Sequence, residues 1–534
     1  MLIQTKKLLL GAAAVAALTA ACGPDTSSAW KQNLQIGTPL ELNGDLAFLN
    51  RSFEQVHVVR SGIRDNALFV DSLRLNTGSE PGQIARSRDE NTLFVVNEGE
   101  RTLSVFDMRG DDEPGVQKVA LGSAYDRISV DPEGQFVLLS FSGNSSKKII
   151  ARNLNELGIV DLRAGLPERA EFVTLFSRAQ DIVFAPPFTL GGRPQRMAAA
   201  LSPSEITLID LEATNEFDRL RSVPLTISQA DQVRNPVQVV FDTTPNEAAP
   251  DTISLYVLTD RGEDITQIVI QPSVREDALR KFDISVNQLA AGQAPVKMAV
   301  LDLPGVGTRL LALDGSRPRF TLVDVTSGES ATFDLPITAA ASDMLVFKTL
   351  PPGGDRVETR VLVYSTRSPL VAIIRPESIA VSGDTPTAGQ TIQAIRAKEA
   401  PQRIIMDGEF DQDRAIAFHA GTQDGFTVFN LRTNRAIPIQ GYGLSDLVFD
   451  GSVGYGVFRD SPHFVRFDLE TGHPTVFDLP APGRRIFAHD TTLLVQHADA
   501  SGSFTVLDAN EPVPAKARHF ENVFFNGLFQ QVLP

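Results

Sequence analysis

A unit of about 50 residues recurs along this chain of 534 residues, and it limits the possible folds more than any other feature of the sequence. In the clearest copy, a short apolar run from Leu93 ends at Asn97, a polar turn follows, and a run of alternating polarity from Leu103 ends at Asp107. Short runs rich in β-branched and aromatic residues, bounded by Gly, Pro, Asp and Asn, are typical of strands. Each unit therefore predicts a β-hairpin. Close copies lie at 197–210, 310–324, 415–430 and 493–508, and looser copies at 47–59, 136–161, 255–270, 361–374 and 453–468.

Further strands are expected on either side of each hairpin. A short apolar run such as Leu447–Phe449 precedes most hairpins, and a more polar run such as Gln117–Leu121 follows. Four antiparallel strands per unit, repeated around an axis, describe the blade of a β-propeller. We therefore predict an all-β propeller over 37–534, with about ten four-stranded antiparallel blades. Two smaller propellers, or an eight-bladed ring with irregular insertions, are the alternatives.

The clearest unit also resembles a known repeat. Phe94–Asn97 (Phe-Val-Val-Asn) and Ser104–Asp107 (Ser-Val-Phe-Asp) are similar to the core of the YVTN-type β-propeller repeat. Propellers with that repeat include lactonases, lyases, surface-layer proteins and binding proteins. The resemblance therefore implies the fold and leaves the activity open.

The two ends of the chain predict how the ring closes. Residues 521–526 have the pattern of an innermost strand, and residues 46–75 offer the three other strands of a blade. A C-terminal strand that completes the N-terminal blade would leave no open sheet edge. We expect this pairing.

The first 21 residues have the build of an export signal. Lys6 and Lys7 precede an apolar stretch, Leu8–Leu18, which is too short to span a bilayer as a permanent helix. Thr19–Cys22 resembles the bacterial lipobox, with Thr in place of the usual Leu three places before the cysteine. An ordinary secretory signal with a chance cysteine is the other interpretation.

The lipobox resemblance implies a location. It implies cleavage after residue 21, lipid on Cys22, and a lipidated tether at 22–36 that holds the protein at a membrane of the cell envelope. Gly23 lacks the Asp that retains lipoproteins in the inner membrane, which favours the outer membrane in a cell that has one. The domain would then be periplasmic or surface-exposed.

Composition excludes several kinds of function. Cys22 is the only cysteine, so once it carries lipid no thiol is left for disulfides, metal sites or nucleophilic catalysis. Of 49 basic residues, 47 remain after Lys6 and Lys7 are removed, against 65 acidic ones, which gives a net charge of −18. Such a chain repels phosphate backbones, so we expect no nucleic-acid partner. The common catalytic and phosphate-binding motifs are absent, and we expect no cofactor.

One set of candidate site residues occupies the same position at the start of successive innermost strands. In a propeller this position lies at the mouth of the central channel. The signs of charge alternate along the set from residue 127 onward, which favours pairing between neighbours over a mouth that binds one kind of ion. The set comprises Gln83, Arg127, Asp181, Gln238, Lys297, Asp343, Arg403, Asp446 and Arg485.

A second set of polar residues ends the second strand of each unit, on the same face. Most of its members are expected to cap turns, as is the Asp that recurs after the third strand. His419 and His497 are the members chosen as candidate site residues. Six of the seven histidines lie between His419 and His519, but their spacing lacks the pattern of a zinc site, and we expect no metal.

Three functions remain open. The first is a non-enzymatic, envelope-anchored module that binds a protein or glycan partner through the loop-bearing face of the propeller. The second is a lactonase- or lyase-like enzyme with its site at the channel mouth, around Arg403, His419, Asp446 and Arg485. The third is a structural component of a surface layer. The missing catalytic motifs favour the first.

Overall fold

The computed structural model describes most of the domain. The described residues are 34–64, 67–110, 114–142, 153–213, 215–226, 233–244, 251–273, 282–351, 355–381, 391–406, 413–419, 425–440, 444–450, 452–489, 491–499, 501–512, 516–525 and 530–532. The predicted signal at 1–21, Cys22 and the tether up to residue 33 lie outside them. None of the helices in these ranges is long and apolar enough to cross a membrane.

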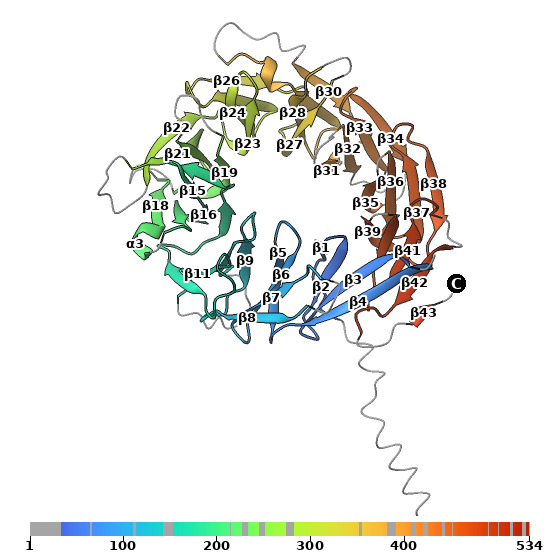
Figure 1. Ribbon diagram of the computed structural model, residues 1–534. Helices are drawn as coiled ribbons and strands as arrows, with labels where there is room; N and C mark the ends of the chain where they lie inside the picture. Colours follow the sequence, from blue (N-terminus) through green and yellow to red (C-terminus); the bar gives the residue numbers. More distant parts are fainter. Residues whose placement is uncertain are drawn as a thin grey trace, which may run out of the picture.

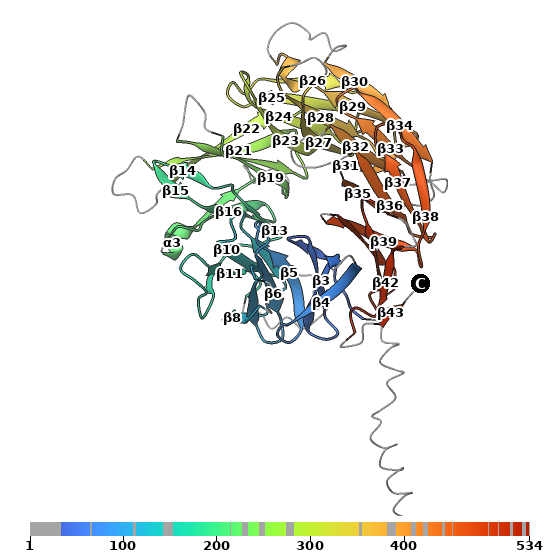
Figure 2. The same cartoon turned by 45° about the vertical axis from the view of Figure 1, so that its right-hand side comes forward.

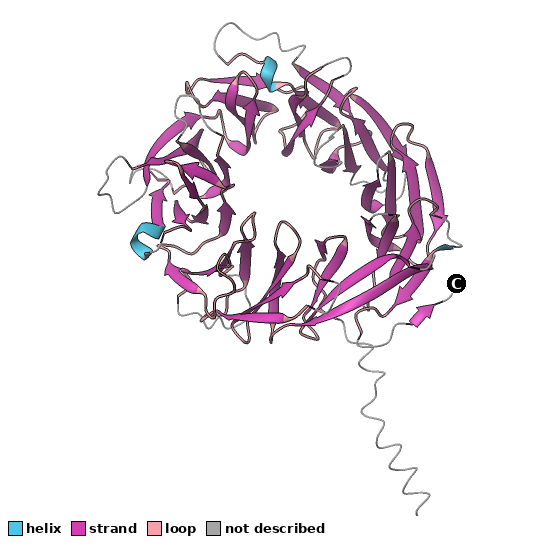
Figure 3. Ribbon diagram, in the orientation of Figure 1, coloured by secondary structure: helices cyan, strands magenta, loops and turns pink. Residues whose placement is uncertain are grey.

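Ten antiparallel sheets of the described strands stand side by side around one axis, as Figure 1 shows. Nine of these ten have four strands, and the tenth has five; an additional two-stranded sheet is a hairpin inserted in one of them. The turned view in Figure 2 shows the same single ring, and Figure 3 shows that strands make up nearly all of it. The predicted ten-bladed β-propeller is confirmed, and the alternatives of two smaller propellers or an eight-bladed ring are wrong.

We number the blades from the N-terminus and give their strands from the innermost outward. Blade 1 is β1 (Leu40–Leu42), β2 (Asp45–Asn50), β3 (Gln55–Arg64) and β4 (Ala67–Asn76). Blade 2 is β5 (Pro81–Arg86), β6 (Thr92–Asn97), β7 (Thr102–Asp107) and β8 (Val116–Ala120). Blade 3 is β9 (Arg127–Val130), β10 (Phe136–Ser140), β11 (Glu156–Asp161) and β12 (Glu171–Thr174). Blade 4 is β13 (Asp181–Phe184), β16 (Met197–Ser202), β17 (Glu205–Asp210) and β18 (Leu220–Pro224), with an inserted hairpin of β14 (Phe188–Leu190) and β15 (Arg193–Gln195) and a short helix α3 (Glu216–Arg219).

Blades 5 to 7 follow the same order. Blade 5 is β19 (Pro236–Asp242), β20 (Ile253–Thr259), β21 (Asp264–Pro272) and β22 (Phe282–Ala290). Blade 6 is β23 (Pro295–Leu303), β24 (Gly307–Asp314), β25 (Arg319–Asp324) and β26 (Ser330–Asp334). Blade 7 is β27 (Asp343–Thr349), β28 (Glu358–Tyr364), β29 (Leu370–Ile374) and β30 (Ile392–Arg396), with a 3-10 turn η1 (Pro376–Ser378) after its third strand.

Blades 8 to 10 complete the ring. Blade 8 is β31 (Pro401–Met406), β32 (Arg414–His419), β33 (Gly425–Asn430) and β34 (Arg435–Gln440). Blade 9 is β35 (Leu444–Asp450), β36 (Val453–Phe458), β37 (His463–Asp468) and β38 (Pro474–Asp478). Blade 10 is β39 (Gly483–His489), β40 (Thr492–His497), β41 (Phe504–Asp508), β42 (Arg518–Glu521) and β43 (Gln530–Val532).

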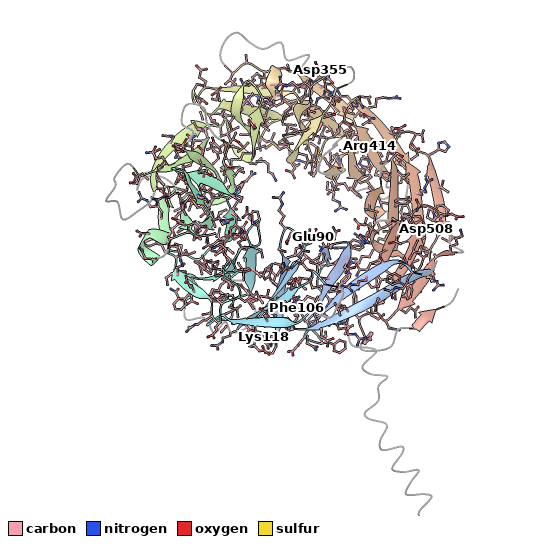
Figure 4. All side chains as sticks on the ribbon, viewed as in Figure 1. Glu90, Phe106, Lys118, Asp355, Arg414 and Asp508 are labelled. Atoms are coloured by element: carbon pink, nitrogen blue, oxygen red, sulfur yellow. The ribbon has the colours of Figure 1, made fainter. Side chains whose placement is uncertain are left out.

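The hydrophobic core is divided among the boundaries between blades, which we call seams. Ten apolar clusters of described residues fill the ten seams, so each sheet is packed on both faces. This explains why the second strands are continuous apolar runs instead of alternating ones. Exposure increases towards the outer strand. In blade 2, Figure 4 shows buried Phe106 of β7 within the wall and half-exposed Lys118 of β8 at its outer edge.

The ring closes between blades 10 and 1 without an exchanged strand, so the predicted closure by residues 521–526 is wrong. The innermost strand of blade 1 is β1, which reaches β2 through Asn43 and Gly44. Both turn residues have positive φ, 48° and 84°, as a two-residue hairpin turn requires. The Asn-Gly pair is a strong signal for a hairpin turn. It therefore indicates a strand before Asn43, although the apolar run of β1 is only three residues long.

The C-terminal segment contributes to closure by packing instead. After β42, Asn522 to Phe525 form a turn, and Phe524 lies against Phe48 of β2 with ring centres 4.9 Å apart. The Asn50 side chain donates a hydrogen bond to the Phe524 carbonyl at 3.4 Å. An apolar strand and a buried turn have similar composition, which is why the sequence pattern alone did not separate them.

The predicted tether is also shorter than expected. Leu34 is buried in the cluster between blades 10 and 1, and Ile36 forms a β-bridge with Asn50. The Gln35 carbonyl accepts a hydrogen bond from the Arg51 backbone at 3.0 Å. Residues 34–36 are therefore part of blade 1.

The β1–β2 turn also joins blade 1 to its neighbours. The Asn43 backbone N–H donates to the Glu90 carboxylate of blade 2 at 2.5 Å, and Figure 4 shows Glu90 near the inner rim of the ring. On the other side, a Cβ atom at Gly44 would overlap the ring of His489 in blade 10. Glycine is thus required here by its conformation and by the close approach of the last blade.

Candidate functional site

Bulges at the start of the innermost strands position the first set of predicted residues. Each bulge places one extra residue opposite the end of the second strand, and the next residue resumes the pairing. Four of the six bulges begin with Pro, which has no N–H to lose at that point. The residues that follow the bulges are Gln83, Gln238, Lys297, Arg403, Asp446 and Arg485.

Several of these side chains reach the innermost strand of the next blade. The Gln83 side-chain Oε1 accepts a hydrogen bond from the Ile128 backbone N–H at 2.9 Å. Gln238 makes two bonds of 2.8 Å with the backbone N–H and carbonyl of Met298. Side chains at this position therefore link neighbouring blades by hydrogen bonds to the backbone of the next blade.

The charged members of the set form ion pairs across seams. Arg127 lies 3.7 Å from Asp181, Lys297 lies 3.0 Å from Asp343, and Arg403 lies 3.9 Å from Asp446. The alternating signs predicted such pairing. All three pairs are partly exposed, so each contributes about 1 kcal/mol or less to stability. Ion pairs between blades therefore explain the charged side chains at four of these positions, Arg127, Asp181, Lys297 and Asp343.

The last three members of the set, Arg403, Asp446 and Arg485, lie together in a cavity. Its volume is about 970 Å³, and it is bounded by the innermost strands of blades 8, 9 and 10 and by Glu41 of β1. Arg459 and Arg484 also line it. Arg459 directly follows the second strand of blade 9, and Arg484 directly precedes Arg485, so the sequence signal for Arg484 is the Arg484–Arg485 pair.

The cavity is rich in cationic groups. Four arginines, two acids and several apolar side chains face it. Within the described ranges, Arg459 and Arg484 have no carboxylate partner, and the nearby charge for Arg485 is Asp446. In a chain of net charge −16, this is a local excess of positive charge in a hollow that is open to solvent, and such an excess attracts anions.

Asp446 interacts with two of these arginines, Arg403 and Arg485. One oxygen accepts from the Ile486 backbone N–H at 3.2 Å, and the other faces Arg403. Burial raises the pKa of Asp446, while the backbone bonds and the charges of Arg403 and Arg485 oppose that rise. A carboxyl with a raised pKa among cations is able both to orient a ligand and to exchange a proton.

Arg403 is held in place by an aromatic ring. Its guanidinium carbon lies 4.3 Å from the ring centre of Phe418, on the neighbouring strand β32. The stacking orders a side chain that is about half exposed, so less rotamer freedom is lost when a ligand binds.

The two predicted histidines lie within their own blades. His497 is buried, its Nδ1 lies 3.2 Å from the Pro482 carbonyl, and its Nε2 lies 2.7 Å from the Thr505 hydroxyl. Burial lowers the pKa of His497. The Nε2 atom of His419 lies 2.9 Å from the Thr427 hydroxyl. Neither histidine is among the residues that line the cavity, so the cavity does not bring them together with Arg403 and Asp446.

The expected capping roles are present. The Asn97 side-chain carbonyl accepts from Gly78 N–H at 3.0 Å, and the Asp314 carboxylate accepts from Ser316 N–H at 2.7 Å. The Asp that recurs after the third strand accepts from the backbone N–H two residues later in six blades. These residues are Asp107, Asp161, Asp210, Asp324, Asp468 and Asp508.

Across the part of the chain that the structure describes, no three His, Cys, Asp or Glu side chains come together in a group that could hold a metal ion.

Comparison with known proteins adds only distant structural likeness. No family of known sequences and no curated protein matches the chain. Among solved structures, it is similar to dihydro-heme d1 dehydrogenase NirN at 12% identity and a TM-score of 0.40, over 74% of this chain and 75% of that one. It is similar to Sqt1 of Saccharomyces cerevisiae at 11% identity and a TM-score of 0.36, over 80% of this chain and 95% of that one. It is similar to AztD of Citrobacter koseri at 12% identity and a TM-score of 0.34, over 69% of this chain and 87% of that one. At these values the likenesses carry no argument about function.

Proposed function

We propose that this protein is an envelope-anchored, non-enzymatic binding module, which holds a protein or glycan partner by acidic groups in the cavity of blades 8, 9, 10 and 1. The observation that carries the proposal is the cavity of about 970 Å³ with four arginines in an acidic chain. Its position near the starts of the innermost strands places it on the face where the hairpin loops between second and third strands also lie. A partner can therefore contact the loops while an acidic group enters the cavity.

The anchor part of the proposal rests on the sequence. The lipobox-like Thr19–Cys22 would place lipid on the cysteine, and residues 23–33 would connect it to blade 1. Eleven residues reach about 40 Å at most when extended. The propeller would work close to a membrane surface, in the outer membrane of a cell that has one. Labelling with a radioactive fatty acid tests this, and label retained by a Cys22→Ser variant would contradict it.

Removing the arginines should weaken binding of an acidic ligand. Neutralising Arg459 and Arg485 together, each to Gln, leaves two arginines against the Asp446 and Glu41 carboxylates, so the cavity loses its excess of positive charge. We expect at least a tenfold loss of affinity, because each charged hydrogen bond contributes about 1.5–3 kcal/mol. Titration calorimetry with an oligogalacturonate measures it, with neutral dextran as the ligand control.

A matched variant separates the site from general charge. Arg435 of β34 is exposed on the outer edge of blade 8, so Arg435→Gln changes one charge outside the cavity and should leave affinity unchanged. A pull-down from envelope extract with lipidated protein then tests the natural partner. Equal retention by wild type and the double variant, or reproducible failure of wild type to retain any protein or glycan, would count against the proposal.

One observation favours a second function, a lactonase- or lyase-like activity. Asp446 has a pKa raised by burial and lies between two arginines, an arrangement suited to proton transfer beside a developing anion. Lactone hydrolysis should then fall by about 100-fold or more in Asp446→Ala, the usual range for loss of a general acid or base. The assay is run with and without divalent metal. Activity that survives the change would exclude Asp446 as the catalytic group.

A further inference from the structure

The second strands of blades 6 to 9 send a long side chain across the seam to the next blade. Arg309 of β24 donates to the carbonyls of Pro376 and Ile379, at 3.3 and 2.5 Å. Arg360 of β28 is fully buried and donates to the Leu431 carbonyl at 3.1 Å. In both seams a guanidinium reaches the turn after the third strand of the following blade.

The next two seams are crossed by other contacts, from Arg414 at the same strand position and from Tyr455 two residues further along its strand. Arg414 of β32 lies 3.8 Å from the Glu470 carboxylate, and Figure 4 places Arg414 in the body of the ring. The hydroxyl of Tyr455 in β36 donates to the Ala509 carbonyl at 2.9 Å. Four successive seams are therefore crossed by a cationic or hydroxyl group that contacts one recurrent turn.

At the seam between blades 5 and 6 a cavity occupies the corresponding place. The second strand β20 presents Ser254 and Tyr256, and the turn after β25, Val325 and Thr326, forms part of the wall. The cavity volume is about 440 Å³, within the range of small-ligand sites and ample for an arginine-sized group. The turn at Pro304 to Gly307 lies at its edge.

Polar groups in this cavity are held in place and carry no positive charge. Asp242 and Gln267 are more than nine-tenths buried, and Gln267 donates to the Ser254 hydroxyl at 3.2 Å. Burial and the nearby Asp242 carboxylate raise the pKa of Tyr256 to about 12. Asp302 adds a second carboxylate, and none of the described lining residues is Lys, Arg or His. The lining is thus suited to a cation.

We infer that this cavity binds a ligand that carries a guanidinium group, which occupies the place that Arg309 and Arg360 fill in the following seams. A guanidinium offers five donors in a plane, which matches a carboxylate together with nearby hydroxyl and carbonyl oxygens. The Asp242 and Asp302 carboxylates supply the charge. This site lies between different blades from the arginine-lined cavity and prefers the opposite charge, so it is independent of the proposed function.

Two sources provide a guanidinium, a free small molecule and an arginine side chain of a partner protein. Calorimetry of the full chain with arginine amide tests the first, and with the tripeptide Gly-Arg-Gly tests the second. Citrulline amide, in which a neutral urea replaces the guanidinium, is the ligand control. We expect saturable binding of one or both arginine compounds and at least tenfold weaker binding of citrulline amide, since charged hydrogen bonds are the stronger ones.

Variants of the protein locate the binding. Asp242→Asn should weaken binding at least tenfold, and Ser254→Arg should abolish it by placing the chain's own guanidinium in the cavity. Asp283→Asn, on the outer strand β22 of the same blade and exposed, should bind like wild type, as should Arg485→Gln.

Three results would contradict binding of a guanidinium group in this cavity. No saturable binding of either arginine compound at millimolar concentration, equal binding of citrulline amide, or full affinity in Asp242→Asn would each overturn the inference. Binding by arginine amide indicates a small-molecule source, and binding by the tripeptide alone indicates a partner protein. If Ser254→Arg does not fold, Asp242→Asn still decides the matter.

Discussion

Phe48→Ala is expected to lower the free energy of unfolding by about 3–5 kcal/mol, the range for deleting a buried phenylalanine. Phe48 is completely buried in the seam between blades 10 and 1, where its ring lies 4.9 Å from Phe524 and 5.8 Å from Phe504. This seam closes the ring by side-chain packing, without a strand shared between the two blades. A void there removes contacts from both ends of the chain at once. Denaturant unfolding followed by circular dichroism measures the change.

Two further variants make the test specific. Phe176→Ala removes a ring that is 73% exposed and should change stability by about 0.5 kcal/mol or less. Phe524→Ala removes the other side of the same contact, so the double variant with Phe48→Ala should lose less than the sum of the two single losses. Full additivity, or a loss for Phe48→Ala as small as that for Phe176→Ala, would show that the closing seam is not held by these rings.

Stability is expected to fall by about 3 kcal/mol between pH 6.5 and pH 4 through His57 alone. His57 lies in the same seam, 5.5 Å from the Phe524 ring. Its Nε2 lies 3.3 Å from the Asn50 amide nitrogen, and its Nδ1 lies 3.4 Å from the Ser72 hydroxyl. Burial and the charge of Arg74 lower the pKa of His57 from 6.5 to about 4.

The direction follows from the lowered pKa. Below pH 6.5 the unfolded chain takes up a proton at His57, whereas the folded chain keeps the ring neutral until about pH 4. Neutral His57 therefore makes its full contribution to the free energy of unfolding above pH 6.5. That contribution is lost as the pH falls from 6.5 to about 4. His497 in blade 10 has a pKa lowered by burial and adds to the loss in the same direction.

A variant without the His57 imidazole supplies the control for this pH dependence. His57→Gln keeps a polar group beside Asn50 and removes the titration, so the variant should lose about 3 kcal/mol less than wild type over the same interval. His473→Gln changes an exposed histidine and should leave the pH dependence unchanged. Parallel pH profiles for wild type and His57→Gln would contradict the assignment. Urea unfolding at several pH values provides the measurement.

Much of the propeller could be predicted from the sequence, because blades are built from local contacts. The hairpins expected at Leu93–Asp107 and at 493–508 are β6–β7 and β40–β41. Each hairpin needs only a turn and two apolar runs that are adjacent in the chain. The shared position of Arg403, Asp446 and Arg485 was also predictable, since it repeats with the strands.

The candidate site was predictable only in part. The alternation of charge indicated ion pairs, and Lys297 with Asp343 is such a pair. His419 and His497 end second strands on the same face as the channel residues, but their side chains bond to Thr427 and Thr505 inside their blades. The direction of a side chain depends on the strands that cover it, and the chain order does not contain that information.

The sequence by itself determined the blade pattern, the strand-ending turns and the presence of a single cysteine at a lipobox-like position. The tertiary structure decided which strands complete blade 1, how the ring closes, and where the seams leave cavities. Whether Asn522 to Phe525 pair as a strand or pack as a turn depends on the space left between blades 10 and 1. That space is set by the curvature of all ten blades together, so no local pattern of residues specifies it.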